Sequence, residues 1–416
     1  MFFSITYFIF YQNLFFFIFL FPFLLSQITL IVSVAYLDFG AFTPEIKEFT
    51  SAGQSVFRLI SLDIYFIFCT STIVLLVSKF NLFKRVLNNQ PIDINGFVTV
   101  KVITYLIILF LIIYGLIFKF PLLESEQRFD YWSTVPFGSL ISKILYVTSS
   151  FGLYFGYFFV KQPHKRLEII LMVILLGLLA ILYSNKFSWF FGLLIFYILG
   201  SGFSYCILSE YKKFRSWFFK ILIKFLLVVC PIVIFGYVFL HGYVGDDLIY
   251  ILKNRVLTMQ GQVWWFVDHY VQNDQINYEI SDIFLKYPED QPSGIFKIME
   301  LIMPKQAFLY YFEKKIPLTM GFPAILIFSG GYFGALVLTP LFALIYSYIY
   351  FYTFLSLLKL SLLRISVVVF MLSALPWAVS LGSTYVIFTP LFVIVILASL
   401  IDVFLLIKRP NEKYAV

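Results

Sequence analysis

The stretch Arg255-Val-Leu-Thr-Met-Gln-Gly-Gln-Val-Trp-Trp-Phe-Val-Asp268 is the densest group of polar and aromatic residues in this chain of 416 residues. It lies in a polar segment, between Leu240 and Gly321, that interrupts a nearly continuous series of long apolar runs. This segment holds ten of the 22 acidic residues and seven of the 30 basic residues. We therefore expect it to form a large loop outside the apolar part of the molecule and to carry the function.

The composition is typical of an integral membrane protein. Hydrophobic residues make up 61% of the chain and charged residues 12%, and the mean hydropathy is +0.94. So few charges cannot cover a soluble protein of this length. The apolar runs are long and lack the short alternating pattern of outer-membrane strands, which favours helices. The predicted fold is all-α, a polytopic membrane protein of about 10–12 transmembrane helices with one large loop outside the membrane.

The apolar runs divide the chain into three parts: an N-terminal transmembrane bundle (1–240), the large loop with short helices (241–322), and C-terminal transmembrane helices with a short tail (323–416). The blocks 1–37 and 321–356 are longer than one span requires. Either can contain a tilted helix, a re-entrant piece such as one at Gly330-Gly331, or an extra helix. The expected spans are 14–37, 59–78, 98–118, 139–160, 168–183, 187–208, 219–240, 323–352, 365–382 and 385–407.

The basic residues predict the orientation in the membrane. Seventeen of them fall in alternate connections, against six in the short connections on the opposite side. Because positive residues concentrate on the cytoplasmic side, we expect both termini inside and the large loop outside. These charges flank helices and form no continuous basic face, so the net charge of +8 gives no support to nucleic-acid binding.

The cysteine and histidine residues predict no metal site. Cys69, Cys206 and Cys230 all fall inside expected spans, and the three histidines are scattered along the chain. The sequence also has no P-loop, no dinucleotide-binding glycine pattern and no GxSxG pattern. We therefore expect neither a metal nor a cofactor.

Two short outward connections carry candidate binding residues. In the first, Arg128 can hold a phosphate or carboxylate with two hydrogen bonds, while Tyr131 and Trp132 offer faces on which a sugar can stack. In the second, Lys186 can supply another positive charge. The alternatives are an aromatic belt at the membrane interface for the first group and a helix-end marker for Lys186.

The large loop carries the strongest candidates. If 251–271 is one helix, Arg255, Gln262 and His269 recur every seven residues and share a face, which suits an anionic, hydroxyl-rich ligand. Trp264 and Asp268 lie on another face. The alternative is a surface helix on the membrane, with its two tryptophans as anchors.

A second helix is expected in the loop at 294–303. This stretch is apolar apart from Lys297 and Glu300, so we expect an amphipathic helix at the outer interface.

The loop residues resemble a known family. The stretch from Arg255 through Gln260-Gly-Gln-Val-Trp-Trp265, followed by Met299-Glu-Leu-Ile-Met-Pro304 and Gly321-Phe-Pro-Ala-Ile325, resembles Wzy-type O-antigen polymerases of Gram-negative bacteria. The RX10G pattern of some members is not matched: Arg255 has no glycine at that spacing, and Gly138 lies one residue too close to Arg128.

The resemblance implies glycosyl transfer at the periplasmic face of the bacterial inner membrane. The growing polysaccharide on undecaprenyl pyrophosphate would move onto a lipid-linked repeat unit, within a glycosyltransferase C-like helical fold. The implied partners are undecaprenyl pyrophosphate-linked oligosaccharide, the lipid bilayer and a chain-length-regulating co-polymerase.

Residue roles follow from the same resemblance. Fixed positive charges can neutralise the leaving pyrophosphate, and a base on the same side must accept the proton of the attacking hydroxyl. The expected pyrophosphate ligands are Arg128 and Arg255, with Lys186 as a third; the base candidates are His269, which we prefer, Asp268, Glu300 and Asp130; and the other expected substrate contacts are Gln262, Tyr131, Trp132, Trp264 and Trp265.

Two other functions remain open. A Wzx-type flippase for the same lipid-linked sugars has similar composition but needs polar groups within its helices. The expected spans contain few ionisable residues, with Asp63 and Asp402 placed near helix ends, which favours the enzyme. An O-antigen ligase shares the implied fold, and the sequence does not separate it from a polymerase.

Overall fold

The computed structural model describes residues 14–79, 95–122, 128–184, 187–208, 210–241, 245–288, 290–318, 321–358, 360–375, 378–379 and 382–408. These parts are mostly helical, with one two-stranded sheet. Five helices among them are long and apolar enough to cross a membrane, by length and composition: Leu20–Leu37, Ser55–Leu76, Gly96–Phe118, Trp189–Ile207 and Ala324–Leu358. The prediction of an all-α membrane protein is confirmed at this level.

The described helices follow the apolar runs of the chain. Within lipid the backbone must satisfy its own hydrogen bonds, and an apolar run does so as a helix. In chain order the helices are α2 (Leu14–Leu37), α3 (Ser55–Lys79), α5 (Asn95–Phe118), α6 (Arg128–Thr134), α7 (Gly138–Thr148), η1 (Ser149–Phe151), α8 (Gly152–Lys161), η2 (Pro163–Lys165), α9 (Arg166–Leu182), α10 (Phe187–Ile207), α11 (Tyr211–His241), α12 (Gly245–Leu257), α13 (Gln262–Gln272), α14 (Ser281–Phe284), α15 (Ile295–Ile302), α16 (Lys305–Glu313), α17 (Ala324–Leu358), α18 (Leu362–Leu375), η4 (Thr384–Phe388) and α19 (Pro390–Lys408).

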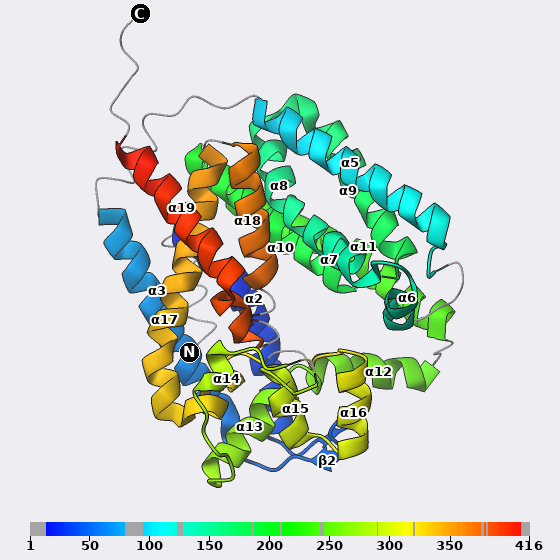
Figure 1. The fold of residues 1–416 in the computed structure, drawn as a ribbon, viewed down its shortest axis with the longest axis vertical. Coiled ribbons are helices and arrows are strands. Elements are labelled where there is room, and N and C mark those ends of the chain that lie inside the picture. The colour runs from blue at the N-terminus through cyan, green and yellow to red at the C-terminus, as the bar shows by residue number, and fades with distance from the viewer. Residues whose placement is uncertain are drawn as a thin grey trace, which may run out of the picture.

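The long helices form two groups, and the short helices α12 to α16 form a layer across one end (Figure 1). In one group α3 packs on α2 and α17, and α18 packs on α17 and α19. In the other, α8 packs on α9 and α10, and α10 also packs on α11. The contact between α2 and α10 joins the two groups. Helices from both ends of the chain therefore build one bundle.

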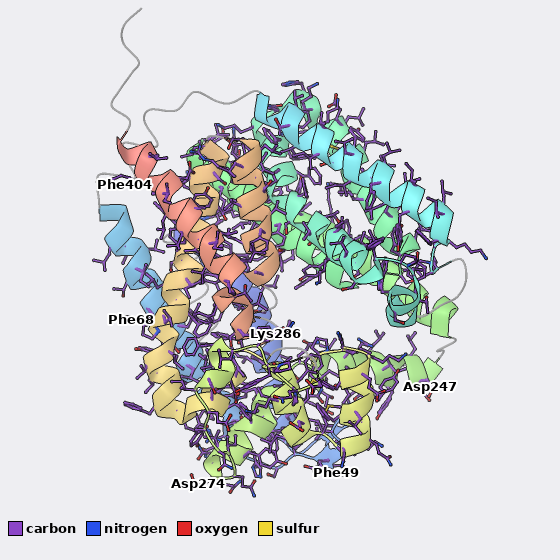
Figure 2. The ribbon with its side chains drawn as sticks, in the orientation of Figure 1. Phe49, Phe68, Asp247, Asp274, Lys286 and Phe404 are labelled. Atoms are coloured by element: carbon purple, nitrogen blue, oxygen red, sulfur yellow. The ribbon has the colours of Figure 1, made fainter. Side chains whose placement is uncertain are left out.

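The surface of the molecule differs between the bundle and the layer (Figure 2). Phe68 on α3 and Phe404 on α19 are 65% and 59% exposed on the sides of the long helices. Asp247 and Asp274 are exposed in the layer. Exposed phenylalanines on the bundle suit contact with lipid, whereas the charged layer suits water.

Glycines let α8 and α10 cross with their backbones in contact. A Cβ on Gly156 would lie 2.0 Å from the carbonyl oxygen of Tyr197, and one on Gly200 would lie 1.8 Å from that of Leu153. Lipid provides no hydrophobic drive between helices, so such close van der Waals packing holds them together. Gly152-Leu-Tyr-Phe-Gly156 is a GxxxG pattern, and it is the sequence signal for this crossing.

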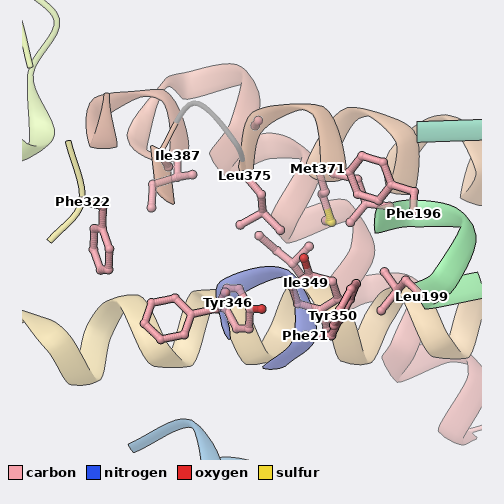
Figure 3. Close-up of a cluster of buried hydrophobic side chains, with 14 of the residues drawn as sticks. Phe21, Phe196, Leu199, Phe322, Tyr346, Ile349, Tyr350, Met371, Leu375 and Ile387 are labelled. Atoms are coloured by element: carbon pink, nitrogen blue, oxygen red, sulfur yellow. The ribbon is translucent and has the colours of Figure 1, made fainter. Parts of the chain in front are cut away.

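A buried aromatic and aliphatic cluster holds α2, α10, α17 and α18 together (Figure 3). Its rings pack edge to face or tilted, as aromatic pairs prefer; the rings of Tyr346 and Tyr350, for example, lie 4.6 Å apart at 52°. The labelled members are Phe21, Phe196, Leu199, Phe322, Tyr346, Ile349, Tyr350, Met371, Leu375 and Ile387.

The chain reverses within α17 at Gly331, whose φ of 63° is accessible to glycine without strain. The ring of Phe322, before the reversal, lies 5.7 Å from that of Phe342, after it. The segment 324–330 must therefore fold back along the rest of the helix. The block 321–356 therefore contains a reversal at Gly331, the position named among the expected alternatives.

A hairpin between α2 and α3 reaches the layer of short helices. Its strands are β1 (Phe42–Thr43) and β2 (Glu48–Phe49), paired antiparallel, and Ile46 in the turn is buried. The hydroxyl of Thr43 donates to the carbonyl oxygen of Glu48 at 2.7 Å. This pairing holds the turn, with Glu45 in it, against the layer.

The amphipathic helix expected at 294–303 is present as α15, but protein covers its apolar face. Ile295, Ile298, Met299 and Ile302 are buried where α15 packs on α13, α16 and α17. Its apolar stripe therefore serves the core of the layer.

Candidate functional site

The stretch expected to form one helix at 251–271 is broken between α12 and α13. The amide of Gly261 donates to the Ser33 hydroxyl on α2 at 2.7 Å, and that hydroxyl donates to the carbonyl oxygen of Leu257 at 3.0 Å. A side chain at Gly261 would collide with the backbone of α2. The single-helix prediction is wrong because this contact turns the chain, so Arg255 lies in the last turn of α12, which ends at Leu257, and Gln262 begins α13.

Glu45, Gln262 and Tyr311 meet where the hairpin turn touches the layer. Together with Arg255, whose charge acts on Glu45 and Tyr311, we call them the Glu45 cluster. The Gln262 amide nitrogen donates to one carboxylate oxygen of Glu45, and the Tyr311 hydroxyl donates to the other at 3.3 Å. The Arg255 guanidinium acts on both Glu45 and Tyr311 through its charge. Gln262 is fully buried, Glu45 and Tyr311 are half-buried, and Arg255 is exposed.

Burial raises the pKa of Glu45 above its ordinary value of 4.5. The hydrogen bonds from Gln262 and Tyr311 and the charge of Arg255 lower that pKa and offset part of the rise. Burial, followed by the charge of Glu45, raises the pKa of Tyr311 to about 12. Glu45 therefore combines a negative charge with a readiness to accept a proton greater than that of a solvated carboxylate.

A second group, the Asp268 cluster, joins α13 to α3 and α17: Arg58, Asp268 and Tyr332. The Arg58 guanidinium holds Asp268 with two nitrogens, Nε to Oδ1 at 2.9 Å and Nη2 to Oδ2 at 2.6 Å. The Tyr332 hydroxyl also donates to Oδ1. Asp268 is 1% exposed. Since its oxygens are buried and occupied, the structure does not support the expected role of Asp268 as a base.

The two tryptophans of the loop are buried rather than open to a sugar. Trp264 is fully buried, and its indole nitrogen donates to the carbonyl oxygen of Ser55 at 3.2 Å. Trp265 is 3% exposed and donates to Asp38 at 2.9 Å. The expected stacking role is corrected for both: their rings fix α13 against the end of α2 and the start of α3.

His269 and Glu300, the other base candidates, are exposed in the layer. The imidazole of His269 stacks on Trp265, with centroids 5.2 Å apart and planes 10° apart, and its Nε2 lies 3.2 Å from the side-chain nitrogen of Asn273. The break at Gly261 removes the helical face that His269 was expected to share with Arg255.

The residues expected from the short connections lie elsewhere in the fold. Tyr131 is buried, with its hydroxyl donating to the carbonyl oxygen of Lys119 at 2.8 Å, and half-buried Trp132 stacks on Tyr183. Figure 1 shows their helix, α6, well separated from α13. The side chains of Arg128 and Asp130, and the whole of Lys186, lie outside the described residues.

Within the bundle, Asp63 lies inside α3 rather than near its end as expected, and it is 1% exposed. Among the described residues neither its oxygens nor the amide of Gln27 on α2 has a hydrogen-bond partner. Asp63 and Gln27 lie one helical turn from Phe66 and Phe23, whose rings are 4.3 Å apart. The two polar groups therefore lie at one depth between neighbouring helices.

Asp402 on α19, in contrast, has a charged partner. Arg364 on α18 donates to Asp402 on α19 through Nε and Nη2, each at 2.8 Å. The Tyr352 hydroxyl donates to the same carboxylate at 3.1 Å.

Sequence reasoning missed Glu45, Tyr311 and Arg58. Glu45 lies in the expected outward connection between the first two spans, on the same side as the large loop, and this is the signal the sequence holds for it. Tyr311 is one of 29 tyrosines, and Arg58 counted only toward the charge bias. Their significance comes from contacts across more than 200 residues of chain.

Comparison with known proteins gives a match to a protein family. A family described as "Family of unknown function (DUF6418)" matches residues 288–396. This range includes Tyr311 and Tyr332 but not the hairpin, α12 or α13. No curated protein and no solved structure matches the chain.

Proposed function

We propose that the protein is a membrane glycosyltransferase that polymerises lipid-linked saccharides, the O-antigen polymerase reaction. It transfers a growing polysaccharide from undecaprenyl pyrophosphate onto a lipid-linked repeat unit at the outer face of the bacterial inner membrane. The Glu45 cluster is the observation that carries this proposal, because it combines a half-buried carboxylate with an exposed arginine whose positive charge acts on that carboxylate.

The chemistry matches this arrangement. The acceptor hydroxyl oxygen attacks the anomeric carbon of the donor, and the bond from that carbon to the pyrophosphate oxygen breaks with its electron pair. Arg255 holds two oxygens of the departing pyrophosphate in its planar fork and neutralises the developing charge. A base on the same side accepts the hydroxyl proton. The apolar sides of the bundle accommodate the lipid chains of both substrates.

A lipopolysaccharide gel of a deletion strain tests the function. Loss of the ladder with one repeat unit kept on the core supports a polymerase, whereas complete loss of O-antigen indicates a flippase or a ligase. Complementation with wild type should restore the ladder and Arg255→Ala should not. Lys253→Ala, which removes another exposed cation from α12, is the matched control and should behave as wild type.

The proposed function also requires that the layer lies on the outer side of the cell membrane. A reporter active only in the periplasm should be active when fused at Asp274, and a cytoplasmic reporter should be active at Lys213. The reverse result at either residue would place the Glu45 cluster on the wrong side for this substrate.

A flippase for the same lipid-linked sugars is the second candidate, favoured by Asp63 and Gln27 inside the bundle. Unpaired polar groups within membrane helices are typical of ion and substrate pathways. Asp63→Asn separates the candidates, because a polymerase should keep its ladder with this isosteric change. A flippase using the carboxyl would lose all O-antigen and accumulate lipid-linked repeat units on the cytoplasmic face.

A further inference from the structure

The turn that carries Glu45 is held so that its carboxylate faces the layer. Pairing of β1 with β2 closes the turn, and burial of Ile46 anchors it. Three helices then contribute one neighbour each: Arg255 from α12, Gln262 from α13 and Tyr311 from α16. Nothing in the sequence alone predicts that these three helices come together. The cluster therefore exists only in the folded layer.

The carboxylate of Glu45 keeps capacity to accept another hydrogen bond. Each of its oxygens receives one described hydrogen bond, from Gln262 or from Tyr311, and a carboxylate oxygen has two lone pairs. In the Asp268 cluster each oxygen receives two contacts at 3.1 Å or less, and the residue is buried. Glu45 can therefore meet a substrate hydroxyl, whereas Asp268 cannot.

We propose that Glu45 is the general base of the transfer, an inference that rests on the proposed function. As the acceptor oxygen bonds to the anomeric carbon, its proton moves to a free lone pair of Glu45. The pair of electrons of the broken bond leaves on the pyrophosphate, which Arg255 holds. Gln262 and Tyr311 are positioning residues, because each fixes one carboxylate oxygen without contacting the reacting atoms.

The pH dependence follows from the groups that face Glu45. Burial raises its pKa, and the described groups opposing this rise are Gln262, Tyr311 and Arg255. A base works only when deprotonated, so activity is present above the raised pKa of Glu45 and is lost as the pH falls through it. The cluster predicts that the rate falls on the acid side at a pH above 4.5, the ordinary pKa of a glutamate. We call this fall in rate the acid limb of the pH profile.

Purified protein supplied with lipid-linked repeat units over a pH series tests the base. Glu45→Gln keeps an oxygen that accepts from the Gln262 amide and gains an NH2 that can donate to the Tyr311 hydroxyl oxygen, so the layer should fold, and binding of the donor lipid should persist. Its turnover should fall about 100-fold or more, and its acid limb should disappear. Glu48→Gln, on the exposed end of the same hairpin, is the matched control and should keep the wild-type rate and profile.

The outcomes separate this inference from the proposed function. If wild type makes no polymer from lipid-linked repeat units, the proposed function fails and this inference with it. If wild type polymerises and Glu45→Gln retains its rate and acid limb, only the base assignment fails. Loss of the acid limb in His269→Ala, with Glu45→Gln unaffected, would assign the base to His269. Persistence of the limb in His269→Ala and its loss in Glu45→Gln is the expected result.

Discussion

Two carboxylates of the layer, Asp268 and Glu45, face cations and tyrosines in similar combinations but in opposite environments. Asp268 is buried, and Arg58 grips both of its oxygens. Glu45 is half-buried, with an amide and a phenol as its hydrogen-bond donors and an exposed arginine near it. The Asp268 cluster joins helices, whereas the Glu45 cluster keeps its charges accessible to a substrate. Residue type does not distinguish these roles, but burial and the number of occupied lone pairs do.

The largest expected effect is on catalysis through Arg255. Arg255→Ala should lower polymerisation about 1000-fold, because the leaving pyrophosphate loses its counter-charge. Arg255→Lys should recover only part of the rate, since lysine keeps the charge but loses the planar fork. Turnover and donor affinity measured on purified protein check this. Normal chain length from Arg255→Ala, expressed at wild-type level, would remove Arg255 from the site.

Substitution of Asp268 should lower the stability of the protein. Asp268→Ala leaves the Arg58 guanidinium without its partner, which should cost about 3 kcal/mol of unfolding free energy. Glu45→Gln, the matched change at the accessible carboxylate, should cost less than about 1 kcal/mol because both contacts can be kept, the one to Tyr311 with its direction reversed. Unfolding in detergent measures both. Equal losses at the two sites would contradict the distinction drawn between them.

A smaller effect is expected from the tyrosine of the Glu45 cluster. Tyr311→Phe removes a hydrogen bond that lowers the pKa of Glu45, so that pKa should rise and the acid limb of turnover should move to higher pH. At neutral pH the rate should fall about tenfold, as the carboxylate loses one of its two positioning bonds. Tyr310→Phe, an exposed neighbour on α16, is the control. A limb that does not move would show that Tyr311 does not act on the base.

The smallest effect is expected at His269. His269→Ala should change turnover by less than about threefold, because the imidazole lies outside the Glu45 cluster. A pH series on the purified variant provides the measurement. A loss as large as that of Glu45→Gln would restore the histidine as base, as the sequence first indicated.

Much of the fold was predictable because an apolar run within lipid must satisfy its own backbone hydrogen bonds, which it does as a helix. The apolar run 14–37 coincides with α2, and 98–118 and 187–208 fall within a few residues of α5 and α10. The reversal at Gly331 was among the expected alternatives, because the run 321–356 was too long for one span and contained the pair Gly330-Gly331. The α8 and α10 crossing was overlooked, although its GxxxG pattern was present in the sequence.

The candidate site was predictable only in part. Arg255 and Gln262 were expected as substrate contacts, and both lie in the Glu45 cluster, but the shared helical face on which they were placed does not exist. Trp264, Trp265 and Asp268 were chosen because their chemistry suits a sugar or a proton. All three are buried and contact other parts of the protein instead. Glu45 was missed because no local pattern links a turn after α2 to a loop more than 200 residues later.

The sequence by itself determined that this is a helical membrane protein with a polar segment between Leu240 and Gly321, because hydropathy and backbone hydrogen bonding act within each run of residues. Only the tertiary structure decided which polar groups of that segment are accessible. The contact of Gly261 with α2 breaks the helix, and packing of α13 on α3 and α17 buries Asp268. Burial and pairing depend on distant parts of the chain, so they appear only when the helices have met.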